Sequence, residues 1–227
     1  MRKTAFPAIA VFARSPVAGR AKTRLIPLLG PRGAAALQAA LILDTTAKVN
    51  GLAHHSTRWL FGVGGKISDF PDRHHWRREV QRGRDLGERL DSAFARLLRR
   101  HVRAVIIGTD SPLLSPRLLR LALTELKACD TVIGPCPDGG FYLVGLRLRI
   151  PGLFRSVRLG SRHAFGDTLK ALLQRGLSCA VLPPVLDIDR PRDLQEFAMR
   201  MARRPELRTA APALGRFLRT NEKMSKR

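Results

Sequence analysis

The sequence has 227 residues, of which 41 are Lys or Arg and 18 are Asp or Glu, so its formal net charge is +23. A hydrophobic content of 44% is that of a globular chain, which excludes wholesale disorder. The sequence contains no uninterrupted run of about 18 apolar residues, the length that a membrane-spanning helix needs. The three cysteines form no C-x-x-C pair, which argues against a disulfide framework or a cysteine zinc site, and we expect a cytoplasmic protein.

The positive charge raises the question of nucleic-acid binding, because cations gain affinity by displacing phosphate counterions. Of the 41 basic residues 33 are arginines, and they are scattered along the chain rather than gathered in one stripe. Trp and Tyr together number three, which leaves little aromatic surface for stacking bases. This pattern does not favour dedicated nucleic-acid binding and fits a compositional bias, although the field would still attract a small polyanion such as a nucleotide.

Short apolar runs alternate with stretches of helical periodicity. The first run follows two basic residues, as in a secretion signal, but it is short and Pro7 interrupts it, so we interpret it as a buried strand. The expected elements in chain order are a strand at 8–13, a helix at 31–50, a strand at 57–63, a helix at 85–100, a strand at 102–108, a helix at 116–129, strands at 131–135 and 141–146, a helix at 167–175, a strand at 178–182 and a helix at 191–203.

This alternation predicts an α/β fold with a mostly parallel sheet and helices on both faces. Residues 1–203 are expected to form a single domain, and the basic segment 204–227 a disordered tail, because its hydrophobic pattern is lost. Residues 66–84 are polar and are expected to be mostly loop. The histidine pairs at 54–55 and 74–75 lack the spacing of a helical zinc site and are expected at the surface.

The candidate site residues directly follow expected strands, because ligands of open α/β sheets bind at the carboxyl ends of the strands. The segment 14–24 carries Arg14, Arg20, Lys22 and Arg24 around Gly19. Such cations can bind phosphate oxygens together with exposed backbone N–H groups. The segment is neither a P-loop nor a dinucleotide fingerprint, and a solvated basic loop is the alternative.

Three further strand ends carry aspartates. Asp110 could hold Mg²⁺ together with substrate phosphates, or it could cap a turn or the helix that begins near residue 115. Asp187 and Asp189 are two residues apart, so an extended backbone points both to one side, where one of them could complete the metal site. The alternative for Asp189 is a helix N-cap. Asp138 precedes two glycines in a predicted tight turn, where a ligand could approach the backbone.

Taken together, five ordered segments resemble the DUF2064 family, whose members are similar to GT-A glycosyltransferases and to nucleotidyltransferases. The segments are residues 12–25, 81–89, 108–112, 134–146 and 187–194. The resemblance implies a Rossmann-like α/β/α sandwich of the nucleotide-diphospho-sugar transferase type that binds a nucleotide and a divalent metal, magnesium or alternatively manganese. The family usually has Lys where Arg14 stands, and a Trp-Ser-Thr segment where this chain has residues 159–162.

The resemblance also implies roles for individual residues. Asp110 would be the metal-binding and catalytic aspartate, Asp189 the second metal carboxylate, and Asp138 a base toward an acceptor hydroxyl. The nucleotide would be bound by residues of the first loop and of the helix after residue 85: Arg14, Gly19, Lys22, Thr23, Arg24, Gly87, Glu88 and Arg89.

The leading hypothesis is therefore a metal-dependent glycosyltransferase-like enzyme that uses a nucleotide sugar and a small-molecule acceptor. The alternative is a nucleotidyltransferase that joins a nucleoside triphosphate to a small phosphorylated acceptor. The Gly-rich opening typical of pyrophosphorylases is missing, which favours the sugar donor. A third hypothesis is a nucleic-acid-binding module without catalysis, which predicts salt-sensitive binding independent of magnesium.

Overall fold

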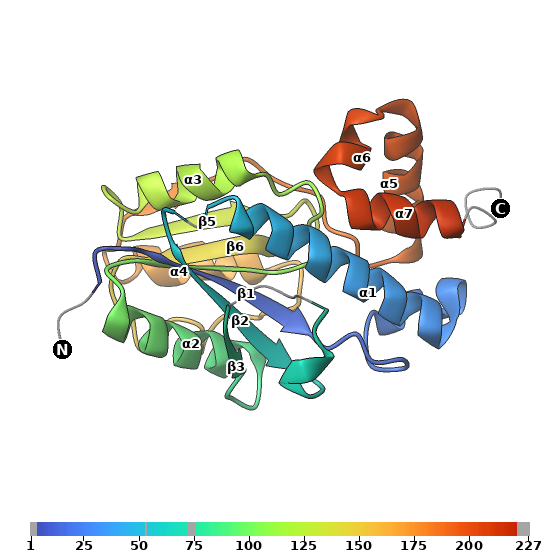
Figure 1. Cartoon of the computed structure of the whole chain (residues 1–227). Coiled ribbons are helices and arrows are strands. Elements are labelled where there is room, and N and C mark those ends of the chain that lie inside the picture. Colours follow the sequence, from blue (N-terminus) through green and yellow to red (C-terminus); the bar gives the residue numbers. More distant parts are fainter. Residues whose placement is uncertain (1–3, 53, 72–75, 222–227) are drawn as a thin grey trace.

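The computed structural model describes residues 4–52, 54–71 and 76–221 (Figure 1). Its centre is a seven-stranded sheet in the order β3-β2-β1-β4-β6-β5-β7. Strand β6 runs antiparallel to β4 and β5, and the other neighbours are parallel, which confirms the predicted α/β class and mostly parallel sheet. The strands are β1 (Ala8–Arg14), β2 (Thr57–Val63), β3 (Arg77–Val80), β4 (Ala104–Ile107), β5 (Thr131–Pro135), β6 (Phe141–Leu146) and β7 (Cys179–Val181).

Helices follow most strands, near the positions that the periodicity predicts. The helix at 31–50 begins earlier, at Ile26, and kinks at Gly30, which has φ +67°. The helix at 167–175 also begins earlier, at Ala164. The helical elements are η1 (Thr23–Leu25), α1 (Ile26–Asn50), η2 (Ile67–Asp69), α2 (Leu86–Arg100), α3 (Pro116–Glu125), α4 (Ala164–Leu173), α5 (Pro191–Arg203), α6 (Glu206–Ala210) and α7 (Pro212–Thr220).

Two hydrophobic layers cover the sheet, one on each face. Helices α1 and α3 pack on the face that Val11 of β1 enters, whereas α2 and α4 pack on the face that Phe12 enters. Successive strand residues point to opposite faces, so β1 is buried between both layers, as its continuous apolar run predicts.

The polar segment 66–84, expected to be mostly loop, contains strand β3, which pairs in parallel with β2 at the sheet edge. Its sequence lacks apolar alternation because its side chains are exposed or half-buried. The Arg77 guanidinium lies 5.3 Å from the Trp59 ring centre and covers it. Charged side chains are common on edge strands because they discourage pairing with other chains. His54 and His55 are exposed as expected, whereas His74 and His75 lie outside the described residues.

The prediction of a disordered tail from residue 204 is wrong for the described part, since α6 and α7 occupy residues 206–220. Leu214 and Phe217 of α7 are buried with Leu37 and Leu41 of α1 and Phe197 of α5 in a third hydrophobic cluster. Two backbone N–H groups at the start of α7, those of residues 213 and 214, donate to Asp44 of α1. These contacts supply the stability that the short α7 lacks by itself. Residues 222–227 of the expected tail lie outside the described residues.

Among the described residues, one helical segment, Thr23–Asn50, is long and apolar enough to cross a membrane by length and composition alone. In the structure this segment forms η1 and α1. Helix α1 lies between the sheet and α7 and contributes buried side chains to two hydrophobic clusters. Packing on two sides accounts for its apolar composition.

Candidate active site

A cavity of about 550 Å³ opens at the carboxyl ends of β1 and β4, the place where open α/β sheets bind ligands. We call it the basic cavity, because five cationic side chains and two carboxylates line it. The lining residues are Phe12, Ala13, Arg14, Arg20, Lys22, Thr23, Arg24, Gln38, Val63, Gln81, Leu86, Arg89, Gly108, Thr109, Asp110 and Asp189.

The first loop enters this cavity with its predicted cations but without Gly19. Gly19 has φ +78°, a conformation that favours glycine, and it shapes the turn before the lysine. Lys22 itself has φ 46°, the one described non-glycine residue in the left-handed region. Such strain is found at functional sites, where neighbouring contacts hold the residue in place. Of the five loop residues predicted to bind nucleotide, Arg14, Lys22, Thr23 and Arg24 line the basic cavity.

Lys22 and Asp110 form an ion pair at the floor of the site, with Nζ 2.8 Å from Oδ1. The lysine side chain is 4% exposed whereas that of Asp110 is 48% exposed. The Lys22 ammonium also donates to the backbone carbonyl of Ile188, and Thr109 Oγ1 donates to Asp110 Oδ1. These contacts occupy Oδ1, so a ligand or cation can approach through the exposed remainder of the carboxylate.

Asp110 does not cap the next helix, which was the alternative role. Ser115 is the N-cap of α3, and its hydroxyl accepts from the Leu118 N–H at 3.2 Å. The backbone carbonyl of Asp110 instead accepts from the Ile188 N–H at 2.8 Å. This bond lays the segment that holds Asp187 and Asp189 across the end of β4.

Two buried glutamines form the back of the basic cavity. Gln38 of α1 donates to the Arg14 carbonyl and to Thr109 Oγ1. Gln81, after β3, donates to the carbonyls of Ala13 and Phe61. Both amides therefore tie strand ends together and hold the first loop in place. Gln38 has no sequence motif that marks it as a site residue, and the one available signal is a polar residue on the buried face of an apolar helix.

The start of α2 contributes one of its three predicted nucleotide-binding residues to the cavity. Arg89 lines it and donates to the carbonyls of Gly83 and Arg84. Glu88 is instead paired with the Arg84 guanidinium, which lowers the pKa of this exposed carboxyl to about 2. A Cβ on Gly87 would lie 3.1 Å from the Phe154 carbonyl, so this glycine allows close packing. Gly87 and Glu88 are not among the residues that line the cavity.

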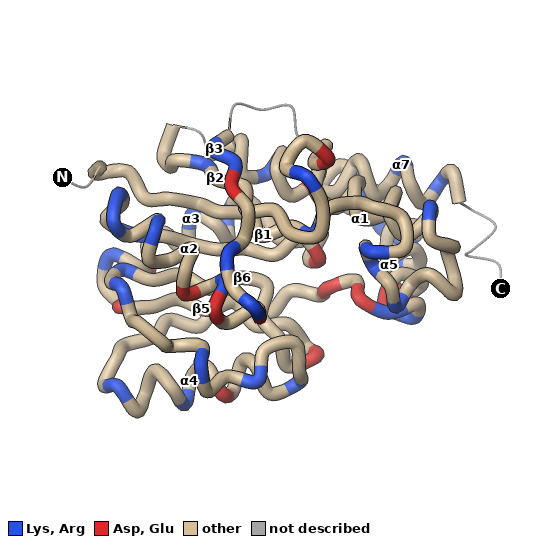
Figure 2. Tube along the Cα trace, turned by 90° about the horizontal axis from the view of Figure 1, so that it is seen from below, with Lys and Arg blue, Asp and Glu red and all other residues tan. Residues whose placement is uncertain are grey.

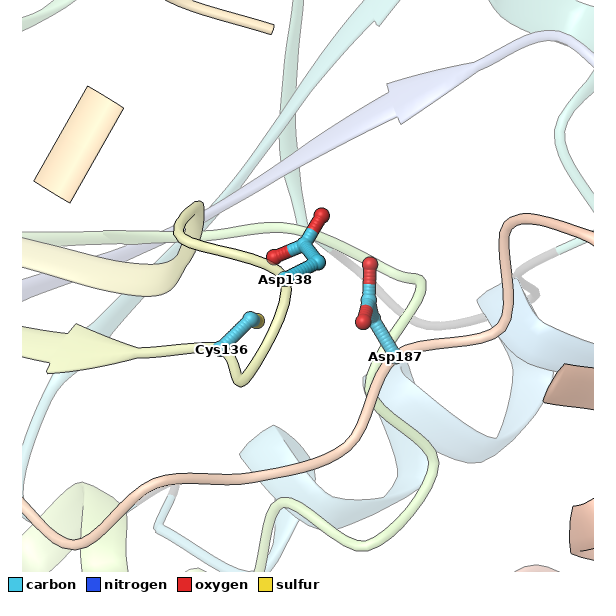
Figure 3. Close-up of side chains that lie close together, drawn as sticks. All are labelled: Cys136, Asp138 and Asp187. Atoms are coloured by element: carbon cyan, nitrogen blue, oxygen red, sulfur yellow. The ribbon is translucent and has the colours of Figure 1, made fainter. Parts of the chain in front are cut away.

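Beside the basic cavity, Asp138 and Asp187 converge with the Cys136 thiol (Figure 3). One ligand atom from each residue lies within 4.8 Å of the other two. The predicted turn after β5 is present, since Asp138 Oδ1 accepts from the Gly140 N–H at 2.8 Å and Gly139 has φ +88°. Burial raises the pKa of Asp187 to about 6, helped by the negative charges of Asp138 and Asp110. Asp138 and Asp187 thus share one site, and Asp110 is near enough for its charge to raise the pKa of Asp187.

These groups suit a hard divalent cation. Carboxylate oxygens are the ligands that Mg²⁺ and Mn²⁺ prefer. The thiol is a poor competitor for a softer metal, because burial and the charge of Asp187 raise the pKa of Cys136 to about 12 and keep it protonated. A cation would also relieve the repulsion between carboxylates that raises the pKa of Asp187. The donor set therefore fits a divalent metal near Asp138 and Asp187, with Asp110 close by.

Asp189, predicted as the second metal carboxylate, is not a member of this three-residue group. Its Oδ2 is paired with the Arg24 guanidinium on the wall of the basic cavity. It is not the cap of α5 either, because Asp193 accepts from the backbone N–H groups of residues 189 and 190. A metal role for Asp189 stays a prediction, whereas Asp187, the other aspartate that could complete the metal site, faces Asp138. Figure 2 shows several acidic residues on the segment that leads into α5 and others spread over the rest of the chain.

A model of the family described as "Uncharacterized protein conserved in bacteria (DUF2064)" matches residues 45–161. The chain belongs to the DUF2064 family. This DUF2064 chain is 28% identical over 194 residues to 2-phospho-L-lactate guanylyltransferase of Methanothermobacter thermautotrophicus, a match that covers 79% of each chain.

Solved structures resemble the DUF2064 protein over most of its length. A candidate nucleotide-diphospho-sugar transferase from Desulfovibrio desulfuricans G20 superposes with a TM-score of 0.86 at 28% identity and covers 98% of both chains. A cytidylyltransferase from Leptospira borgpetersenii superposes with a TM-score of 0.60 at 13% identity over 98% of both chains. The protein therefore has the fold shared by nucleotidyltransferases and nucleotide-diphospho-sugar transferases, as expected.

Proposed function

We propose that this protein is a metal-assisted nucleotidyltransferase, which transfers the nucleotidyl group of a nucleoside triphosphate to an oxygen atom of a small acceptor and releases pyrophosphate. The observation that carries the proposal is the basic cavity. Five cationic side chains line it beside two carboxylates, which leaves three surplus positive charges. A triphosphate carries about four negative charges and a sugar diphosphate two, so the surplus favours the triphosphate as the donor.

The cavity also suits the remainder of a nucleotide. Phe12, Val63 and Leu86 provide apolar surface, and Gln81 lies at the same wall with its carbonyl oxygen not used in any bond among the described residues. Such a combination of apolar walls with a few polar groups is typical of small-molecule sites. We therefore expect the base of the nucleotide to lie toward α2, beside these groups, and its phosphates to lie toward the first loop.

The reaction is an in-line displacement at the α-phosphorus. A new bond forms between the acceptor oxygen and phosphorus, the bond from phosphorus to the bridging oxygen breaks, and pyrophosphate leaves with that electron pair. Lys22 and Arg24 stabilise the charge that builds on the leaving group, because buried or preformed cations need no reorganisation during the step. Asp138 accepts the proton where the acceptor oxygen is a hydroxyl. A divalent cation held by Asp187 and Asp110 would supply Lewis-acid neutralisation of phosphate charge and leave Asp138 free to act as the base.

This proposal reverses the preference for a sugar donor that the missing Gly-rich opening suggested. The guanylyltransferase relative covers most of the chain. In addition, the cationic side chains of the basic loop can bind phosphate oxygens, a role that backbone N–H groups have in a Gly-rich opening. Transfer from a nucleotide sugar remains the second candidate, because the structure with the TM-score of 0.86 bears a nucleotide-diphospho-sugar transferase name.

The two candidates differ in the products that they release. The test supplies each α-³²P-labelled nucleoside triphosphate with Mg²⁺ and a panel of small hydroxyl and phosphate acceptors. Nucleotidyl transfer yields pyrophosphate and an acceptor that carries the label. With nucleotide sugars in place of triphosphates, glycosyl transfer yields a free nucleoside diphosphate. Release of nucleoside diphosphate from sugars, with no label transferred from any triphosphate, contradicts the proposal in favour of the second candidate.

A further inference from the structure

A second cavity, of about 590 Å³, adjoins the basic cavity. We call it the arginine cavity. Arg24 and Asp189 line both cavities, so their ion pair lies in the wall between the two. The residues that line the arginine cavity are Arg24, Asp138, Gly160, Ser161, Arg162, Asp189, Arg190 and Arg192.

Two of its four arginines have no carboxylate partner among the described residues. Arg24 is paired with Asp189, and Arg192 lies 3.4 Å from Asp193. No ion pair of that kind is formed by Arg162 or Arg190 within the described part of the chain. Arg162 Nε donates to the His163 ring at 3.3 Å, so two guanidinium groups that lack a carboxylate partner border one cavity. Such groups match the geometry of carboxylate and phosphate oxygens.

The backbone that carries Arg162 is held in place on both sides. Arg158 and Asp167 form a two-bond ion pair across the loop, at 2.7 and 2.9 Å. The Ser161 hydroxyl donates to the Arg158 carbonyl and accepts from the His163 N–H. These bonds fix the direction of the loop, so less entropy is lost when a ligand orders the Arg162 side chain.

The same loop packs against the turn that bears Asp138. The Phe165 N–H donates to the Gly139 carbonyl at 3.0 Å, and a Cβ on Gly139 would lie 2.0 Å from the Arg162 carbonyl oxygen. The absence of a side chain at residue 139 thus lets the backbone of Arg162 lie close to the turn that carries Asp138. Arg190 is the N-cap residue of α5, and its backbone N–H donates to Asp193 at 2.7 Å.

From this arrangement we propose that the arginine cavity binds the acceptor, and that the acceptor is a small anion whose carboxylate or phosphate is held by Arg162 and Arg190. The inference rests on the proposed function, because it takes the basic cavity as the donor site. Asp138 lines the arginine cavity and also belongs to the cluster of Cys136, Asp138 and Asp187. An acceptor held at the arginines would therefore place its reacting oxygen between its anionic end and the donor.

The experiment measures binding of three probes that share one carbon skeleton: glycerol 3-phosphate, glycerate and glycerol. Each is titrated calorimetrically into the full chain with Mg²⁺ and the α,β-methylene analogue of the triphosphate that binds best. The variants are Arg162→Gln and Arg190→Gln. Arg120→Gln is the matched control, since this arginine is exposed on α3 and lines neither cavity.

We expect one or both anionic probes to bind and glycerol not to bind. Each cavity variant should bind the anionic probe at least about tenfold more weakly than wild type, because a charge-assisted bond is lost. Its affinity for the triphosphate analogue should be unchanged, and the control variant should bind both compounds as wild type does. Glycerol 3-phosphate and glycerate distinguish phosphate from carboxylate as the preferred anion.

Three results overturn the inference. They are failure of both anions to bind while the triphosphate analogue binds, equal probe affinity in wild type and both cavity variants, and a loss of triphosphate affinity in the variants equal to the loss of probe affinity. If the triphosphate analogue itself does not bind the wild type, the proposed donor site fails instead. The two failures are thus distinguishable.

Discussion

Replacing Asp187 by Asn should make the metal-free protein more stable at neutral pH while removing its response to divalent metal. Burial and the neighbouring carboxylates raise the pKa of Asp187 from 3.8 to about 6. Ionisation therefore disfavours folding, so stability is lost as the pH rises from about 3.8 through about 6. Two pKa units correspond to at most about 3 kcal/mol, and because the side chain is half-buried we expect about 1–2 kcal/mol after solvent screening.

Urea unfolding in EDTA at pH 8 and pH 4.5 measures this effect. The Asp187→Asn variant should be more stable than wild type at pH 8, and the gain should be smaller at pH 4.5, where the wild-type carboxyl is mostly protonated in the folded state. Asp189→Asn is the matched control, since Asp189 is paired with Arg24 and its replacement should give no such gain. With Mg²⁺ added, the melting temperature of wild type should rise and that of Asp187→Asn should not. A variant less stable than wild type at pH 8 in EDTA, or a gain equal at both pH values, refutes the reasoning.

Substitutions at three further positions test other contacts of the structure. Asp110→Asn should abolish turnover and leave the circular dichroism spectrum unchanged, and retained turnover would reject the role of this carboxylate. Asp44→Ala should lower the free energy of unfolding by about 1–3 kcal/mol, because two buried N–H groups of α7 lose their acceptor; Asp44→Asn keeps one acceptor oxygen and should lose less. Gly139→Ala should cost at least about 1 kcal/mol of stability, since its backbone has φ +88° and a Cβ meets the Arg162 carbonyl, and unchanged stability in urea would disprove that contact.

The sheet and its main helices could be predicted from the sequence because their apolar periodicity is local. The strands at 57–63, 131–135 and 141–146 and the helix at 191–203 have the predicted bounds. Strand β3 could not be predicted in the same way, because an edge strand with polar side chains has no apolar pattern to detect. Its position depends on pairing with β2, which is a tertiary contact.

Helix α7 was missed for a related reason. Its N-terminal N–H groups are capped by Asp44, which lies 169 residues earlier in the chain, and the described sequence around its start provides no side-chain cap. A window of neighbouring residues cannot reveal such a partner. Sequence periodicity therefore fails to predict helices whose stability comes from packing against the core.

The candidate site could be located but not resolved in detail. The rule that ligands bind at strand ends, together with the family resemblance, found Arg14, Lys22 and Asp110, which the structure brings to one cavity. Spacing alone could not decide which aspartate joins Asp138, because the ion pair with Arg24 turns Asp189 toward the basic cavity and leaves Asp187 facing the turn. That choice depends on side-chain contacts between segments far apart in sequence.

The central claim is that the basic cavity holds the phosphates of a nucleoside triphosphate and that the adjoining carboxylates hold its metal. A crystal structure with Mg²⁺ and an α,β-methylene nucleoside triphosphate tests it most directly. We expect phosphate oxygens in contact with Lys22 and Arg14, and a metal ion bound to Asp187 together with Asp110 or Asp138. A triphosphate bound away from the first loop, or a metal ion without any of these three carboxylates, would contradict it.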